Sequence, residues 1–245
     1  MNAEQEIQQK TRRGFLALGA GMAAAVGGFA WLYPAADAEV IPGPLRCVLN
    51  FNERVVRSAL YDNSHLVKTF SAGEVGKLRA NGKAGLEPPL DMAQWGLDLV
   101  KAGDTKPSAR LTMAEIQGLP RTEEIIEFKC IEGWSAVTQF AGVRLADFTA
   151  RFAAGSEKAP YVRMETPDRE YYVGLDTPSA MHPQTLLAWE MNGAPLTTEH
   201  GAPLRLVIPV KYGVKNIKRI GRIEFMEQRP GDYWAEQGYD WYAGL

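Results

Sequence analysis

The residues best suited to chemistry are a group of cations near the C-terminal end of the sequence. Residues 205–222 carry six basic side chains and no acidic one, although the chain of 245 residues has a net charge of −2. These side chains are Arg205, Lys211, Lys215, Lys218, Arg219 and Arg222. With Gly213 inside the segment, several of them can converge on one anion while backbone N–H groups complete a phosphate cradle. The alternative, which charge alone favours, is a solvated strand face.

Cys130 is the second candidate. Residues 122–131 alternate like a β-strand and lead into E-G-W-S, so Cys130 should lie at a strand end, where sites are usually built. A thiolate there would suit a soft, redox-active metal. The alternatives are a disulfide with Cys47, favoured by an oxidising compartment, or two buried thiols.

Other familiar catalytic motifs are missing from the sequence. It contains no G-x-G-x-x-G, no Walker A motif, no H-E-x-x-H and no C-x-x-C. The three histidines, His65, His182 and His200, are too scattered for a convincing zinc site. Without further information, the disulfide or the two buried thiols remain the preferred interpretation of Cys130.

The elements that must position these residues read as one mixed α+β domain without internal repeats. Thr112 and Glu115 form a T-x-x-E capping box, which predicts a short helix ending near Gly118. The remaining expected elements are strands at 45–51, 95–100, 122–131, 204–209 and 220–225, a loop at 64–91, a helix at 142–152, a hairpin turning at 167–169 and a turn at 191–195.

The composition indicates an ordinary soluble globular protein, with 46% hydrophobic and 23% charged residues. Its 27 basic and 29 acidic residues leave no overall electrostatic attraction for nucleic acid, so we expect no nucleic-acid partner. Any anion site must come from a local cluster.

The first residues are typical of an export signal. Arg12 and Arg13 stand before a run that is uncharged from residue 14 to residue 36, and A-D-A follows at 36–38. This order predicts a twin-arginine signal at residues 1–38, a periplasmic location and a functional domain at residues 39–245. The alternative is a retained transmembrane anchor.

Three segments carry a resemblance to a known family. K-C-I-E-G-W-S at 129–135, A-M-H-P-Q-T-L-L-A at 180–188 and the long motif at 200–218 resemble the sulfite-oxidase-fold molybdopterin enzymes. Within that group they most resemble the catalytic subunits of bacterial periplasmic protein-methionine-sulfoxide reductases. The resemblance implies a sulfite-oxidase-like α+β domain that holds one molybdenum-molybdopterin per chain.

The resemblance also implies roles for individual residues. The metal-ligating cysteine of the family corresponds to Cys130. The residues that correspond to its pterin contacts are Asn81, Thr166, His200 and Arg205, and those of its phosphate-holding stretch are Asn216, Ile217 and Lys218. The front of the site departs from the family pattern, because R-A-N-G-K-A-G at 79–85 offers Asn81 but lacks the Tyr-Glu pair that follows in the reductases.

Glu132, two residues beyond Cys130, is a candidate proton donor. A carboxyl desolvated beside the metal would hold its proton, and reduction of an oxide consumes protons. The alternative for Glu132 is a structural hydrogen-bonding role. His182 is expected to be structural, and the aromatic tail at 233–242 is expected to serve packing or docking.

These observations predict an exported molybdenum-dependent oxidoreductase that reduces an S-oxide or N-oxide, free or protein-bound. Sulfite-type oxidation is an alternative, but a glutamate beside the metal opposes a dianion. A non-catalytic anion-binding protein of the same fold is another. Because no haem-binding C-x-x-C-H occurs in the sequence, the resemblance implies a membrane haem subunit or a cytochrome as electron partner.

Overall fold

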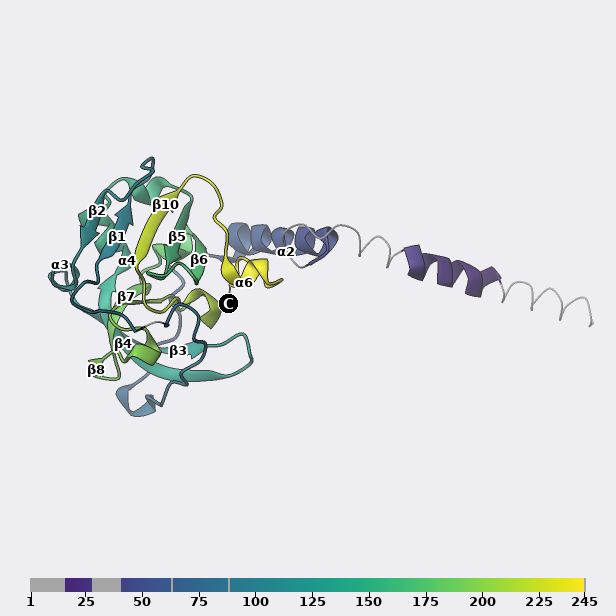
Figure 1. Cartoon of the computed structure of the whole chain (residues 1–245). Coiled ribbons are helices and arrows are strands. Elements are labelled where there is room, and N and C mark those ends of the chain that lie inside the picture. Colours follow the sequence, from purple (N-terminus) through teal and green to yellow (C-terminus); the bar gives the residue numbers. More distant parts are fainter. Residues whose placement is uncertain (1–15, 28–40, 63, 88, 245) are drawn as a thin grey trace, which may run out of the picture. The chain divides into compact units, whose positions relative to one another are not determined.

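The structure, a computed structural model, describes residues 16–27, 41–62, 64–87 and 89–244 (Figure 1). It divides into two compact units, residues 1–55 and 56–245. In the first unit, residues 16–27 are helical and α2 spans Gly43–Val55. Across the described stretches, no helix combines the length and apolar character needed to cross a bilayer. The predicted signal features Arg12, Arg13 and residues 36–38 lie outside the described residues.

The second unit contains two five-stranded sheets, which lie one above the other in Figure 1. The strand order of the first sheet is β2-β1-β10-β5-β6. Its strands are β1 (Leu97–Val100), β2 (Ala109–Leu111), β5 (Tyr161–Glu165), β6 (Tyr172–Asp176) and β10 (Arg222–Met226). Only the β1–β10 pair is parallel among the described pairs, so this sheet joins an early strand to a late one.

The second sheet is antiparallel throughout its described pairs. Its strands are β3 (Thr122–Lys129), β4 (Ser135–Arg144), β7 (Leu186–Met191), β8 (Ala194–Pro195) and β9 (Arg205–Val207), with both β8 and β9 on β7. The β4–β7 register shifts between Ala141 and Gly142. A Cβ on Gly142 would stand 2.0 Å from the Leu187 carbonyl oxygen, so only glycine permits this close approach of two backbones.

Short helices connect the strands. The α-helices are α3 (Met113–Gln117), α4 (Leu145–Phe152), α5 (Thr177–Ala180) and α6 (Tyr233–Glu236). A π-helical turn, η1, spans Val56–Leu60, and the 3-10 turns are η2 (Ala72–Glu74), η3 (Ser156–Lys158), η4 (Thr198–His200) and η5 (Gly213–Lys215). The α3 capping box is confirmed, because Glu115 N–H donates to Thr112 Oγ1 at 3.3 Å and Glu115 Oε2 accepts from Thr112 N–H at 2.8 Å.

Apolar side chains form one large core and a smaller one. The large core includes Leu97, Leu99, Phe148, Val162 and Ile223, which come from the first sheet and from α4. The smaller core lies against the second sheet and consists of Leu78, from the loop before β1, and Ile126, Phe128, Phe140, Leu186, Ala188 and Val207, from the strands. The strand ends that follow this smaller core carry the site described below.

The predicted α+β class is confirmed, as are the strand at 95–100, the hairpin and the strand that ends at Cys130. The predicted strand at 45–51 is wrong, because these residues lie inside α2. Leu45 and Val48 are three residues apart, a spacing that suits a helix, and Pro44 follows the first helical residue, where proline is favoured. The helix predicted at 142–152 is wrong in its first turn, since β4 continues to Arg144 and pairs with β7. Strands β4 and β7 themselves are not predicted by the sequence patterns.

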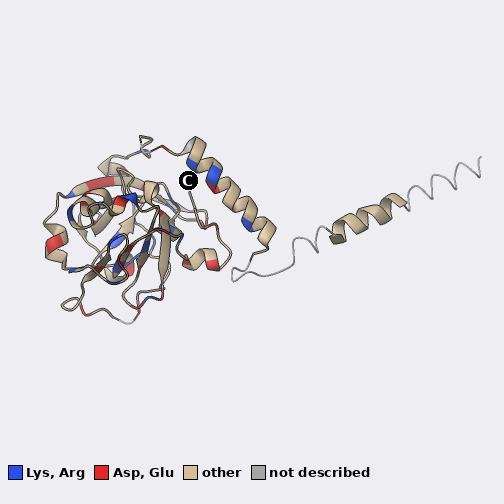
Figure 2. Ribbon diagram, turned by 90° about the horizontal axis from the view of Figure 1, so that it is seen from above, with Lys and Arg blue, Asp and Glu red and all other residues tan. Residues whose placement is uncertain are grey.

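Basic and acidic residues are interspersed along the ribbon of the second unit (Figure 2). This distribution agrees with the balanced composition. The two cations that matter for the site are in a pocket rather than on an open surface.

Candidate active site

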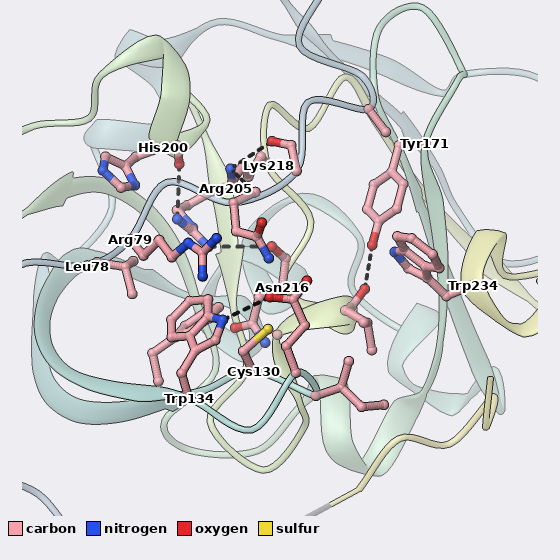
Figure 3. Close-up of a pocket in the computed structure, with 18 of the residues that line it drawn as sticks. Leu78, Arg79, Cys130, Trp134, Tyr171, His200, Arg205, Asn216, Lys218 and Trp234 are labelled. Atoms are coloured by element: carbon pink, nitrogen blue, oxygen red, sulfur yellow. Dashed lines mark hydrogen bonds between the residues drawn. The ribbon is translucent and has the colours of Figure 1, made fainter.

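A pocket lies where the end of β3, the loop before β1, the 200–218 segment and the C-terminal tail meet (Figure 3). It is lined by Leu78, Arg79, Asn81, Gly82, Ala84, Phe128, Cys130, Ile131, Glu132, Trp134, Tyr171, His200, Arg205, Gly213, Val214, Asn216, Lys218, Trp234 and Tyr239. Seven of the predicted site residues are therefore brought together: Asn81, Cys130, Glu132, His200, Arg205, Asn216 and Lys218.

Cys130 sits in the tight turn that joins β3 to β4. Its N–H donates to the Trp134 carbonyl at 2.9 Å, and its carbonyl accepts from Gly133 N–H at 3.1 Å. Gly133 has a φ of 88°, which a glycine adopts without steric cost. Cys130 is buried and Cys47 is exposed, and both are free thiols. The disulfide stays a prediction, because Cys47 belongs to the first unit and Cys130 to the second. In the structure the Cys130 sulfur is free to act as a ligand.

Arg205 and Lys218 supply positive charge on one side of Cys130 (Figure 3). Arg205 donates to the His200 carbonyl at 3.1 Å, and its guanidinium lies 5.2 Å from the centre of the Phe140 ring. Lys218 Nζ donates to the Asn81 carbonyl at 2.6 Å. Neither cation forms a salt bridge to a carboxylate of the described residues. Both charges are thus left for an anion to neutralise.

The pKa values of this wall are lowered mainly by burial and by the neighbouring cations, and the charge of Glu199 opposes both shifts. Burial, together with the neighbouring Arg205, lowers the pKa of Lys218 to about 8. Burial also lowers the pKa of His200, and the charges of Arg205 and Lys218 lower it further. An anion bound between these groups would reverse the shift at Lys218, because it would stabilise the protonated amine.

Two buried polar atoms of the same wall have no hydrogen-bond partner among the described residues. They are His200 Nδ1 and Arg205 Nε. A buried polar atom without a partner is costly, and in native proteins such atoms usually serve a ligand or an ion. These two atoms lie on residues that line the pocket, so they are ready contacts for a polar ligand.

Four of the six cations of the basic cluster are engaged by other partners and do not line the pocket. Lys211 pairs with Asp176 at 3.0 Å and Lys215 with Asp232 at 2.5 Å, and all four side chains are buried. Arg222 pairs with Glu224 at 3.0 Å, and Arg219 donates to the Leu86 carbonyl at 2.7 Å. Of the six, only Arg205 and Lys218 line the pocket.

Glu132 does not meet the condition for a proton donor that the sequence suggests. The carboxylate is exposed and accepts from Trp134 Nε1–H at 3.0 Å. Hydrogen bonds from Trp134 and Asn81 and the charge of Arg79 lower its pKa, whereas the role of proton donor requires a raised pKa. Burial is too slight to oppose them. The structure therefore favours the alternative, a hydrogen-bonding role that holds Trp134 and Asn81 in the pocket wall.

Two predicted cofactor-binding residues, Thr166 and Ile217, are not among the residues that line this pocket. Thr166 is buried behind the loop before β1, where it donates to Asp168 at 2.5 Å and faces a second cavity with Trp95, Arg110 and Arg222. Ile217 is buried in the large core. Their roles toward a cofactor stay predictions. His182 is buried and hydrogen-bonded to Gln184 N–H, as a structural histidine would be.

Sequence reasoning misses the aromatic side of the pocket. Tyr171, Trp234 and Tyr239 line it, although the sequence suggests only packing or docking for the tail. In Figure 3 the rings of Tyr171 and Trp234 lie across the pocket from Arg205 and Lys218. The only available signal is the density of aromatic residues at 233–242, which does not show where the tail folds.

Comparison with known proteins places this geometry in context. Residues 85–234 match the family model described as an oxidoreductase molybdopterin binding domain. The chain is 36% identical over 161 residues to the protein-methionine-sulfoxide reductase catalytic subunit MsrP of Xanthomonas campestris pv. campestris, covering 60% of this chain and 49% of the relative. It is 35% identical over 170 residues to MsrP of Campylobacter jejuni subsp. jejuni, covering 62% and 56%. The chain thus spans about half the length of these relatives.

A solved structure shares the fold. The sulfane dehydrogenase SoxCD of Paracoccus pantotrophus aligns with a TM-score of 0.51 at 21% identity, over 58% of this chain and 40% of the other. This likeness concerns the fold alone.

Proposed function

The chain belongs to the oxidoreductase molybdopterin-binding domain family, whose cofactor is molybdenum-molybdopterin, and from this premise we propose that it reduces an S-oxide or N-oxide in the pocket around Cys130. The observation that carries the proposal is the presence, in one pocket, of a free buried thiol and two cations without carboxylate partners among the described residues. A soft metal and an anionic group on the same ligand would satisfy both.

The residues of the pocket fit such a cofactor. The sulfur of Cys130 is the donor type that a soft metal prefers. The unpartnered His200 Nδ1 and Arg205 Nε offer polar contacts, and the positive charges of Arg205 and Lys218 suit a phosphate group. Asn216 is already fixed, because its Oδ1 accepts from Ile208 N–H at 2.8 Å and its Nδ2 donates to the Tyr212 carbonyl at 3.1 Å.

In the proposed reaction the cofactor and the protein have different roles. When bound, molybdenum-molybdopterin supplies two-electron oxygen-atom exchange. For a sulfoxide the overall reaction balances in atoms and charge, since the sulfoxide, a pair of electrons and a pair of protons give the thioether and one molecule of water. Cys130 would hold the metal, Arg205 and Lys218 would hold the anionic end of the cofactor, and Glu132 would keep Asn81 and Trp134 in position.

With Arg205 and Lys218 assigned to the cofactor, the Glu132 carboxylate is the charge that disfavours an anionic substrate, and the Arg79 guanidinium beside it offsets part of this effect. The Glu132 carboxylate lies in the pocket wall, on the turn that carries Cys130. A dianion such as sulfite would meet this negative charge, whereas a sulfoxide or an amine oxide carries no net charge. The names of the MsrP relatives, which are methionine sulfoxide reductase catalytic subunits, support the sulfoxide as substrate class.

We further propose that the protein is exported to the periplasm by the twin-arginine route and receives electrons from a membrane haem subunit or a cytochrome. The adjacent Arg12 and Arg13 before the uncharged run at 14–36 support export. Replacement of both arginines by lysine, followed by cell fractionation, tests this proposal. Unchanged export of the double variant would contradict the twin-arginine route.

The function is tested by molybdenum content and turnover together. Protein matured in a cofactor-competent host should contain nearly one molybdenum per chain by elemental mass spectrometry and should reduce methyl phenyl sulfoxide with a reduced viologen dye. Cys130→Ala should lose turnover. Cys47→Ala is the matched control, because Cys47 is the exposed cysteine and should behave as wild type. Folded wild-type protein without molybdenum would contradict the proposal and leave an anion-binding protein.

A further inference from the structure

We propose that the C-terminal tail, residues 233–242, forms the substrate-side wall of the pocket and selects oxides whose sulfur or nitrogen carries an apolar, preferably aromatic, substituent. This inference rests on the proposed function and names the substrate class of the same site. Its residues are Trp234 and Tyr239, which line the pocket from the tail.

The pocket has two chemically different sides. The side with Arg205, Lys218 and His200 is charged and polar and suits the cofactor. Opposite it the tail contributes Trp234, with Tyr239 packed against that ring, while Phe128 and Trp134 line the pocket on the side of Cys130. If the cofactor occupies the polar side, the space that remains for a substrate is bounded by rings. Pockets bind ligands mainly through such apolar and aromatic surface.

The rings form a continuous series. Tyr171 and Tyr233 have centroids 5.2 Å apart, Tyr233 and Trp234 5.3 Å, and Trp234 and Tyr239 5.2 Å. The planes of the last two pairs are inclined by 86° and 70°, an edge-to-face arrangement that aromatic rings favour. The Tyr171 hydroxyl donates to the Val214 carbonyl at 2.6 Å, which attaches the series to the pocket wall.

Buried charge holds the tail in this position. Asp232 caps α6, since its Oδ1 accepts from Ala235 N–H at 3.0 Å. Its other oxygen accepts from Lys215 Nζ at 2.5 Å and from Gly174 N–H at 3.1 Å. Lys215 ends η5, whose Gly213 and Val214 line the pocket. The start of the tail is thus fixed directly to the pocket wall.

Trp234 and Tyr239 pack against each other but keep ring surface that the protein does not cover. The buried cluster of the tail consists of Ala235, Trp241 and Tyr242, and it does not include the other two rings. Tyr239 retains 38% of its exposure. Trp234 is half-buried. Large aromatic surfaces at a pocket mouth can still be covered by a ligand, and a phenyl or alkyl substituent beside the oxide would cover them.

Binding of unreactive analogues tests the inference without turnover. Methyl phenyl sulfone and dimethyl sulfone are titrated into the holoenzyme by calorimetry, with molybdenum measured on each sample. Wild type should bind the phenyl compound at least about tenfold more tightly. Trp234→Leu and Tyr239→Leu should each reduce this preference about three- to tenfold, the range expected for one aromatic contact. Tyr233→Phe is the matched control, since it keeps its ring and does not line the pocket, and it should retain the preference.

Kinetics give a second measure. In both leucine variants the KM for methyl phenyl sulfoxide should rise by the same factor at unchanged molybdenum content, with little change in kcat. Equal binding of the two sulfones by wild type, or an unchanged preference in both leucine variants, would overturn the inference. Selective sulfone binding without sulfoxide reduction would overturn the proposed function, but it would still support selection of apolar substituents by the tail.

Discussion

The charge on Lys218 should make anion binding to the pocket fall steeply above neutral pH. Lys218 Nζ is held by the carbonyls of Asn81 at 2.6 Å and Gly82 at 3.3 Å. Burial and the nearby Arg205 place its pKa at about 8. Sulfate is the probe of choice for cofactor-free protein, because it resembles a phosphate and keeps its double charge throughout the range tested.

The size of the effect follows from the pKa. With a pKa of about 8, the protonated fraction of Lys218 falls from about 90% at pH 7 to about 10% at pH 9. If sulfate requires the protonated amine, its Kd rises about tenfold. At a sulfate concentration about ten times the Kd at pH 7, stabilisation falls from about 1.4 to about 0.4 kcal/mol. The loss of about 1 kcal/mol corresponds to about 2–4 °C in Tm for a unit of this size.

Thermal unfolding with and without sulfate at pH 7, 8 and 9 measures this loss. Without sulfate, the lowered pKa of Lys218 means that the unfolded chain binds more protons between about pH 8 and the ordinary value of 10.5, so this group adds stability as pH rises. The sulfate effect is therefore the difference in Tm at each pH. Lys218→Met should remove its pH dependence, and Lys83→Met, an exposed lysine of the loop before β1, should retain it. A sulfate shift that stays constant from pH 7 to pH 9 in wild type would refute the reasoning.

Three further outcomes are expected. Gly142→Ala should lower the free energy of unfolding by more than about 3 kcal/mol in thermal melts, because its Cβ would meet the Leu187 carbonyl oxygen at 2.0 Å. Gly133→Ala should cost only about 1–2 kcal/mol, because Gly133 has a φ of 88° but open space around it. Equal losses in the two variants would contradict this account. Asp232→Ala should cost about 3–5 kcal/mol because it leaves a buried lysine unpaired, and a loss below about 1 kcal/mol in the same melts would argue against a charged pair. Glu132→Gln should lower the inhibition constant of sulfite by up to about fivefold at unchanged molybdenum content, whereas an unchanged constant would show that this charge does not discriminate against dianions.

Local hydrogen-bonding signals in the sequence predict structure correctly. The α3 capping box involves residues three apart, and the hairpin of β5 and β6 depends on a short turn. The predicted strand at 45–51 fails because a short apolar run suits a strand or a helix equally, and no partner strand can be seen in sequence. Strand β4 is missed for a related reason, since its identity depends on pairing with β7, whose residues lie more than forty positions further along the chain.

The polar part of the pocket could be predicted from the sequence. Residue type and position point to Cys130, Arg205 and Lys218, the family resemblance selects the same residues, and all three line the pocket. The aromatic side could not be found, because the ring of Tyr171 meets the wall through a carbonyl 43 residues away. The same holds for Trp234. Its helix, α6, is capped by Asp232, and Asp232 is held by an ion pair with Lys215, which lies 17 residues earlier in the chain.

The basic cluster at 205–222 contains two kinds of cation, those with buried carboxylate partners and those that line the pocket. A count of charges at 205–222 cannot separate cations that have buried carboxylate partners from those that have none, because the partners, Asp176 and Asp232, lie outside that segment. Two lysines are neutralised there and connect the segment to β6 and to the start of α6. Arg205 and Lys218, left without such partners in the described structure, remain for the ligand. One stretch of sequence therefore lines the polar side of the pocket and, through the Lys215–Asp232 pair, holds the start of the tail in place.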